Sequence, residues 1–469
     1  MRRAILCLAL LVVGGCSYYN GMYNTKRLAG RARKAEKEGR TFDATSLWGQ
    51  VGVRAESVLA QHPTSKWTDE ARLLQATSMS RLRDCASALR PLETLVITSR
   101  NPAIVEEANL LLGNCRTTLG DPAGAADAYG RLVGSKDPER RRLALFAHGR
   151  AQRIQGNFET ALEELAGTNY PGTRGERAAA LAGLGRLDEA TLLLDSLLAD
   201  RDTLVPWDSL LAGAARHDPE AASKLTDRIV AESGVPLPVR CRLLVADAVR
   251  WRPTDRARSD ARLAQMERLS ARSLQAADAR MAALRLEVEE VDSLPELIAW
   301  ASRAEDLAEG TGQVGPVALQ LAGQARRVIL AADSVAAGAP NGELRLFLAG
   351  EIARDSLGAN RLAARQFRRI AAEWPQSPFA AKALLALIPL EPSGADTVRQ
   401  RLSTTYAASP YLAMIENGAS AEYQVLEDSL FRFSVNFRPG ARRPGVQNVR
   451  PQNPAPAPAP AAPREPVNR

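Results

Sequence analysis

The sequence predicts an all-α fold, an α-solenoid of helical hairpins, and two observations support this prediction. Aromatic residues make up 5% of the chain and hydrophobic residues 45%, mostly alanine and leucine, which suit closely packed helices better than strands. Small residues and turn glycines also recur at nearly constant spacing. A chain of 469 residues usually folds into several globular domains, but a solenoid grows by stacking each repeat on its neighbours.

The N-terminal residues have the pattern of a secretory signal. Arg2 and Arg3 precede an apolar run over residues 4–13, which is shorter than the roughly 20 residues needed to span a bilayer. We therefore predict a signal peptide over residues 1–15. The sequence Val-Gly-Gly-Cys at residues 13–16 resembles the lipobox of bacterial lipoproteins, which implies a mature chain that begins at a lipid-modified Cys16. The alternative is an ordinary cleaved signal with an incidental cysteine.

The lipoprotein resemblance also bears on localisation. Some lipoproteins carry an aspartate after the modified cysteine, which retains them in the inner membrane, whereas this chain has Ser17. The resemblance therefore implies an outer-membrane lipoprotein that faces the periplasm or the cell surface.

The net charge of +8 is concentrated at the two ends of the chain. Residues 17–40 carry seven Lys/Arg against two Glu, and residues 438–469 carry six Arg against one Glu. Each flank thus contributes +5 and the signal contributes +2, which leaves residues 41–437 at −4. No nucleic-acid partner is expected from this distribution. We predict a basic tether over residues 16–40, which either contacts anionic lipid headgroups or is a solvated linker.

Small residues recur at matched offsets from residues 106 and 142, which lie 36 positions apart. The matched positions are Gly113, Gly120, Ala125 and Tyr129 in the first copy and Gly149, Gly156, Ala161 and Leu165 in the second. This pattern resembles the tetratricopeptide repeat, a helical hairpin with small residues at its helix contacts and a glycine at its turn. Weaker copies cover residues 85–95, the turn at Gly185 and residues 344–375.

Proline junctions support the same helix boundaries. Asp121-Pro122, Asp137-Pro138 and Asp218-Pro219 each place a capping side chain before a proline that can open a helix. A Pro-x-Ser-x-aromatic junction occurs at residues 63–67 and 375–379. It resembles the periplasmic repeat lipoproteins of the outer-membrane β-barrel assembly machine and of the Tol–Pal system. We predict repeats over residues 41–200 and 343–390, with degenerate helical hairpins over 201–342.

The character of the chain changes after residue 390. We predict a helical cap over residues 391–437 that includes a short extended segment, because Phe431, Phe433, Val435 and Phe437 alternate with polar residues at the period of a strand. This segment could pack on the last helix or add as a strand to a partner. Residues 438–469 are rich in proline, arginine and alanine, which predicts a disordered tail.

The sequence offers little that could support catalysis. The chain has three histidines, none at metal-ligand spacing, and no Gly-Lys-Ser/Thr follows a strand. Glu56-Ser57 matches the catalytic pair of lytic transglycosylases, but the rest of their motif is missing. We expect no enzyme, no cofactor and no metal site.

Cys85, Cys115 and Cys241 remain once Cys7 leaves with the signal and Cys16 carries lipid. In the repeat register, Cys85 and Cys115 lie on neighbouring antiparallel helices and could form a disulfide, which an oxidising periplasm permits. Closing a loop of about 30 residues would stabilise the fold by roughly 3–4 kcal/mol. The alternative is two small buried side chains at a tight helix contact.

The resemblance to tetratricopeptide repeats implies a protein-binding groove lined by the first helix of each hairpin. The corresponding positions include Asn109, Arg116, Leu145 and Gln152. The function expected from this resemblance is a membrane-anchored interaction scaffold of the bacterial cell envelope that binds envelope proteins. The alternative is a structural lipoprotein whose basic tail bridges the outer membrane and peptidoglycan.

Overall fold

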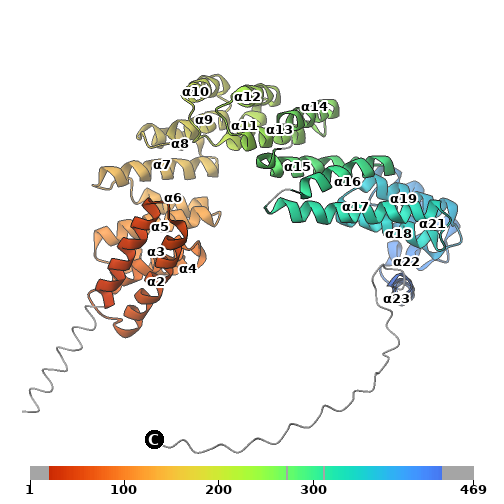
Figure 1. The fold of residues 1–469 in the computed structure, drawn as a ribbon, viewed down its shortest axis with the longest axis horizontal. Coiled ribbons are helices and arrows are strands. Elements are labelled where there is room, and N and C mark those ends of the chain that lie inside the picture. The colour runs from red at the N-terminus through yellow and green to blue at the C-terminus, as the bar shows by residue number, and fades with distance from the viewer. Residues whose placement is uncertain (1–20, 271–272, 310–311, 436–469) are drawn as a thin grey trace, which may run out of the picture. The chain divides into compact units, whose positions relative to one another are not determined.

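The computed structural model describes residues 21–270, 273–309 and 312–435, and every regular element in these ranges is a helix (Figure 1). Helices that follow one another in sequence pack against one another as antiparallel hairpins. This confirms the predicted all-α solenoid. The signal peptide, Cys16 and the tail over residues 438–469 lie outside the described residues.

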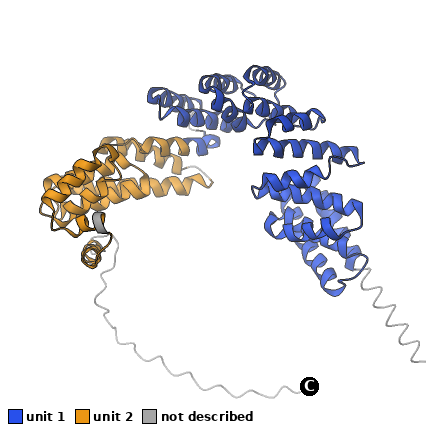
Figure 2. Ribbon diagram, turned by 180° about the vertical axis from the view of Figure 1, so that it is seen from behind, with its two compact units in different colours: residues 1–280 blue, residues 281–469 orange. Residues whose placement is uncertain are grey.

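The chain divides into two compact units, residues 1–280 and 281–469 (Figure 2). The first unit begins with a helix over residues 21–37. It continues with α2 (Thr41–Gln61), α3 (Thr68–Arg81), α4 (Cys85–Thr98), α5 (Pro102–Thr118), α6 (Pro122–Gly130), α7 (Pro138–Gln155), α8 (Phe158–Ala166), α9 (Thr173–Gly183), α10 (Leu187–Ala199), α11 (Trp207–His217), α12 (Pro219–Ala231), α13 (Leu237–Trp251), α14 (Arg256–Ser270) and η1 (Leu274–Ala276).

The boundary between the units falls within α15 (Ala277–Val288). The second unit then contains α16 (Leu294–Ala308), α17 (Val314–Ala336), α18 (Gly342–Glu351), η2 (Ile352–Leu357), α19 (Asn360–Glu373), α20 (Pro378–Leu387), η3 (Pro392–Gly394), α21 (Ala395–Thr405), α22 (Pro410–Asn417) and α23 (Ala421–Val435).

The prediction of a tether over residues 16–40 is wrong for residues 21–37, which form a helix of the folded core. Met22, Leu28 and Ala32 are buried in one cluster with side chains of α2 and α3. These residues lie on one helical face behind the basic residues, so the high charge of the segment concealed its apolar side. The first described hairpin is therefore this helix with α2.

The structure confirms the repeat register. Gly120, Gly156 and Gly185 close hairpin turns with φ of +77°, +90° and +76°, a left-handed conformation that favours glycine. A Cβ atom added at Gly113 would lie 2.5 Å from the Tyr129 ring, and one added at Gly149 would lie 2.8 Å from Leu165. These glycines therefore permit the two helices of a hairpin to pack closely.

Ion pairs join equivalent positions of consecutive hairpins. Arg140 Nη1 lies 2.6 Å from Glu106 Oε2, and these residues are 34 positions apart. The period persists into the region predicted to be degenerate, where Arg242 pairs with Asp208 at 2.8 Å across 34 positions and Arg262 pairs with Asp227 across 35. Residues 207–262 therefore retain the repeat geometry, which the sequence pattern there does not reveal.

A buried polar cluster joins α12, α13 and α14. The Asp247 side chain is 0% exposed, and its carboxylate accepts hydrogen bonds from the Ser223 hydroxyl and from Arg262 Nε, both at 2.8 Å. Arg250 Nη1 donates to the same carboxylate at 2.5 Å, and Trp251 Nε1 donates to Ser223 Oγ at 2.8 Å. The negative charge of the buried Asp247 carboxylate is thus balanced by the guanidinium groups of Arg250 and Arg262.

The prediction of an extended segment at the end of the cap is wrong for residues up to 435, because α23 continues to Val435. Leu430 and Ser434 are buried four residues apart, whereas Phe431 is 58% exposed, which is helical rather than alternating burial. Phe433 packs with its ring centroid 6.5 Å from that of Phe379 on α20. Phe437 lies outside the described residues, and the helical structure of Ala421–Val435 contradicts the strand-addition hypothesis for this segment.

Candidate functional site

The two groove positions predicted on α5 take part in internal packing. Asn109 is 1% exposed and donates from Nδ2 to the Val105 carbonyl oxygen at 2.9 Å, so its assignment to the groove is wrong. The Arg116 side chain is 22% exposed; it donates to the Gly124 carbonyl oxygen at 3.1 Å and pairs with Glu93 at 2.9 Å. Asn109 thus bonds within α5, whereas Arg116 links α5 to α4 and α6.

The two positions predicted on α7 are partly buried. Gln152 Oε1 accepts a hydrogen bond from Asn157 Nδ2 at 2.8 Å, and its Nε2 lies 3.2 Å from His148 Nε2. Leu145 is partly covered as well. None of the four predicted positions presents a fully exposed, uncommitted side chain.

The two cysteines predicted to meet lie at the contact between α4 and α5. The structure bonds Cys85 to Cys115, with their Cα atoms 4.9 Å apart, which is within the usual range for a disulfide. Cys241 is a buried free cysteine, and burial raises the pKa of its thiol.

No helix of the described residues combines the length and hydropathy needed to cross a bilayer. Within residues 21–270, 273–309 and 312–435, no three His, Cys, Asp or Glu side chains gather in an arrangement that could hold a metal ion.

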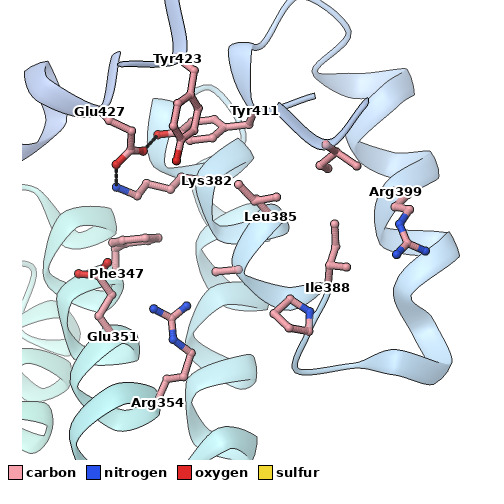
Figure 3. A pocket seen from close by; sticks show the side chains of 13 residues that line it. Phe347, Glu351, Arg354, Lys382, Leu385, Ile388, Arg399, Tyr411, Tyr423 and Glu427 are labelled. Carbon is pink, nitrogen blue, oxygen red and sulfur yellow. Dashed lines mark hydrogen bonds and ion pairs between the residues drawn. The ribbon is translucent and has the colours of Figure 1, made fainter. Parts of the chain in front are cut away.

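The second unit contains a pocket of about 380 Å³ between α18, η2, α20, α22 and α23 (Figure 3). Its apolar lining includes Phe347, Leu385, Ile388 and Ile415. Charged and phenolic groups line the remainder, and they come from elements that lie far apart in the sequence. Apolar walls with a few placed polar groups are typical of binding sites.

Glu427 organises one wall of this pocket. Its carboxylate accepts a hydrogen bond from the Tyr411 hydroxyl at 2.5 Å and pairs with Lys382 Nζ at 2.7 Å (Figure 3). Burial and the Glu427 carboxylate raise the pKa of Tyr411, so its phenol stays a hydrogen-bond donor. Lys382 Nζ also lies 5.1 Å from the centroid of the Phe347 ring. These groups satisfy one another without a ligand.

Glu351 has an uncommitted side chain in the pocket. The residue lies at the end of α18 and is partly buried, and its carboxylate makes no hydrogen bond or ion pair within the described part of the chain. Burial raises its pKa, against the opposing effect of the positive charges of Lys382 and Arg354. An unpaired acceptor of this kind could receive a hydrogen bond from a ligand.

A π-helical turn, η2, follows Glu351 directly. The Ala359 amide closes it by donating to the Ala353 carbonyl oxygen at 2.8 Å, and Gly358 ends it with φ of +75°. Arg354 lines the pocket from this turn and pairs with Asp355 at 2.6 Å. π-Helical turns are rare and occur frequently at functional sites, which supports this pocket as the candidate site.

Replacing Glu351 with glutamine is expected to stabilise the second unit in a pH-dependent manner. Because burial raises the folded-state pKa of this carboxyl above its ordinary value of 4.5, the resulting destabilisation is absent below pH 4.5 and develops as the pH rises through the folded pKa. Thermal unfolding should therefore show a higher midpoint for Glu351→Gln than for the wild type at pH 7 and equal midpoints at pH 4. The matched control is Asp306→Asn, at an exposed carboxyl of α16. Equal shifts for both variants would contradict this assignment.

The comparisons with known proteins provide no family. No protein-family model matches the chain, and no curated protein matches it either. Among solved structures, that of Naa15/Naa10 bound to HypK-THB is similar to 89% of this chain and to 69% of its own chain, with 14% sequence identity and a TM-score of 0.28. A likeness this remote says nothing about function.

Proposed function

We propose that this chain is a lipid-anchored interaction scaffold of the bacterial cell envelope, in which stacked helical hairpins bind partner proteins. The anchor is the acyl group on Cys16, and the protein faces the periplasm or the cell surface from the outer membrane. The proposal includes no chemical step, no cofactor and no metal.

The observation that carries the binding role is the pocket of the second unit. Its apolar side chains Leu385, Ile388 and Ile415 surround a space of about 380 Å³, which can accept an apolar side chain of a partner protein. Glu351 would accept a hydrogen bond from the same partner segment. The hydroxyl of Tyr411 is already used by Glu427, whereas the carboxylate of Glu351 is free to contribute to specificity.

Support for the anchor comes from the lipobox-like residues that end at Cys16. Residue 21, five positions later, lies in a helix that packs on α2 and α3. Mass spectrometry of the mature N-terminal peptide should find acylated Cys16, and Cys16→Ala should release the protein from the membrane fraction.

The experiment that tests partner binding is crosslinking in native cells, followed by pull-down of the full-length chain and of a chain cut after Phe437. If the protein is an interaction scaffold, both versions should recover the same defined set of envelope proteins. The alternative function, a structural bridge to peptidoglycan, draws on the six arginines of residues 438–469. It predicts recovery of peptidoglycan fragments only, and loss of that recovery when the tail is removed.

A further inference from the structure

The helix over residues 21–37 has two faces of opposite chemistry. Its buried face contributes Met22, Leu28 and Ala32 to the core of the first hairpins. Its exposed face carries a basic stripe at helical spacing. The members of this basic stripe are Arg27, Arg31, Lys34 and Lys37, all exposed.

The charge of the basic stripe is largely uncompensated. Arg27, Arg31 and Lys37 make no ion pair within residues 21–270, 273–309 and 312–435, and Lys34 reaches Glu38 at 3.7 Å with its side chain 74% exposed.

The neighbouring acidic groups make their closest contacts with residues outside the basic stripe. They comprise Glu36, which accepts from Trp48 Nε1 at 2.8 Å, Glu38 and Asp43, which pair with Arg40 at 2.7 and 2.6 Å, and Glu70, which pairs with Lys26 at 2.7 Å. The exposed face of this helix therefore projects net positive charge into solvent.

We propose that the basic stripe binds the anionic phospholipid headgroups of the membrane surface, so that the first hairpin lies flat on the bilayer. This inference rests on the proposed anchoring at Cys16. The five residues from Cys16 to the start of the helix at 21 span at most about 18 Å, which keeps the helix within reach of the headgroups. Tyr23 is 54% exposed on the same face, and tyrosine favours the membrane interface.

The proposed contact with the membrane is electrostatic and does not insert the helix into the lipid. An interfacial amphipathic helix buries its apolar face in the lipid, but here that face is already buried against α2 and α3. The attraction must therefore come from Lys and Arg near the surface, each contributing roughly a fivefold gain in partitioning. Such binding weakens as salt screens the charges.

The test uses the full mature chain with Cys16→Ser, so that no lipid contributes. Flotation is measured with vesicles of phosphatidylcholine alone and with vesicles containing phosphatidylglycerol. The test variant combines Arg27→Gln, Arg31→Gln, Lys34→Gln and Lys37→Gln. The matched control removes four positive charges at exposed arginines without ion pairs, Arg90→Gln, Arg100→Gln, Arg141→Gln and Arg177→Gln.

The wild type and the control variant should bind phosphatidylglycerol vesicles and not pure phosphatidylcholine. The test variant should bind roughly 600-fold more weakly, since it lacks four basic residues that each contribute about fivefold. Raising the salt concentration several-fold should release the wild type. Absence of binding by the wild type, or equal losses in the two variants, would overturn the inference. Preference for a nucleic acid or an acidic cell-wall polymer over the vesicles would also overturn it.

Fluorescent labels test whether the helix over residues 21–37 is the part of the protein that contacts the membrane. Fluorophores attached through Gly30→Cys and Gly134→Cys suit this purpose, because a Cβ at either glycine meets no atom within 4 Å. Quenching by a lipid-attached quencher is expected at residue 30 and not at residue 134. Failure of this inference can be distinguished from failure of the proposed anchor, because acylation of Cys16 is measured separately. Vesicle binding without acylation would refute the anchor alone, and acylation without vesicle binding would refute the basic stripe alone.

Discussion

Replacing Asp247 with alanine is expected to destabilise α12, α13 and α14 by about 3–5 kcal/mol, because it leaves buried charges without their partner. In the wild type the carboxylate is 0% exposed and compensates the guanidinium groups of Arg250 and Arg262. Burial already lowers the pKa of Arg250, and the attraction of Asp247 opposes this effect. The free energy of unfolding is measured by urea titration, followed by tryptophan fluorescence, to which Trp251 of the same cluster contributes.

The matched control for this prediction is Asp195→Ala. Asp195 also pairs with an arginine, Arg228, at 2.9 Å, but the two side chains are 49% and 50% exposed. Exposed pairs contribute little, since water and salt screen them. If the loss for Asp247→Ala were no larger than the loss for Asp195→Ala, the buried cluster would not stabilise these helices as described.

Reduction of the Cys85–Cys115 disulfide is expected to lower the free energy of unfolding by about 3–4 kcal/mol in the chain-entropy model. The bond joins α4 to α5 across a sequence separation of 30 residues. Urea titration with and without reductant measures the effect. The double variant Cys85→Ser and Cys115→Ser should show no response to reductant, which isolates the bond from general effects of the reagent.

Thiol counting decides whether the bond forms at all. The denatured, non-reduced mature chain should show one free thiol besides any at Cys16, that of Cys241. A count of three would mean that Cys85 and Cys115 are only small buried side chains at a tight helix contact.

The repeat register could be predicted from the sequence because its signals are local. A left-handed turn residue such as Gly120 and a close helix contact such as that at Gly113 both require glycine, and both recur at the spacing of one hairpin. The helix over residues 21–37 was mistaken for a tether because charge dominated its composition. Apart from Met22 and Leu28, its apolar face consists of alanines such as Ala32, which give a weak pattern.

The end of the cap was predicted wrongly for a different reason. Aromatic residues alternate near residue 431, but α23 continues through them and leaves Phe431 58% and Phe433 39% exposed. Leu430 and Ser434 are both buried on one helical face, and this packing favours the helical period over the alternating period of a strand. Alternation over so few residues cannot distinguish a strand from a helix that exposes aromatic side chains.

The candidate site could not be predicted from the sequence because its residues come from separate elements. Glu351, Lys382 and Glu427 lie on α18, α20 and α23, and no sequence spacing brings them together. The groove residues were predicted from the repeat register alone, and Asn109 shows the limit of that reasoning. Its position on the helix is turned toward the core, where its amide bonds to Val105.

The central claim is that partner proteins bind the helical units, and site-specific photo-crosslinking at the pocket tests it most directly. A photoreactive amino acid replaces Ile388, which lines the pocket, or Leu330, which is 66% exposed on α17 and serves as the control. The account predicts that residue 388 captures a defined envelope protein in native cells and that residue 330 does not. Capture of no protein at residue 388, or of the same proteins from both positions with equal yield, would contradict it.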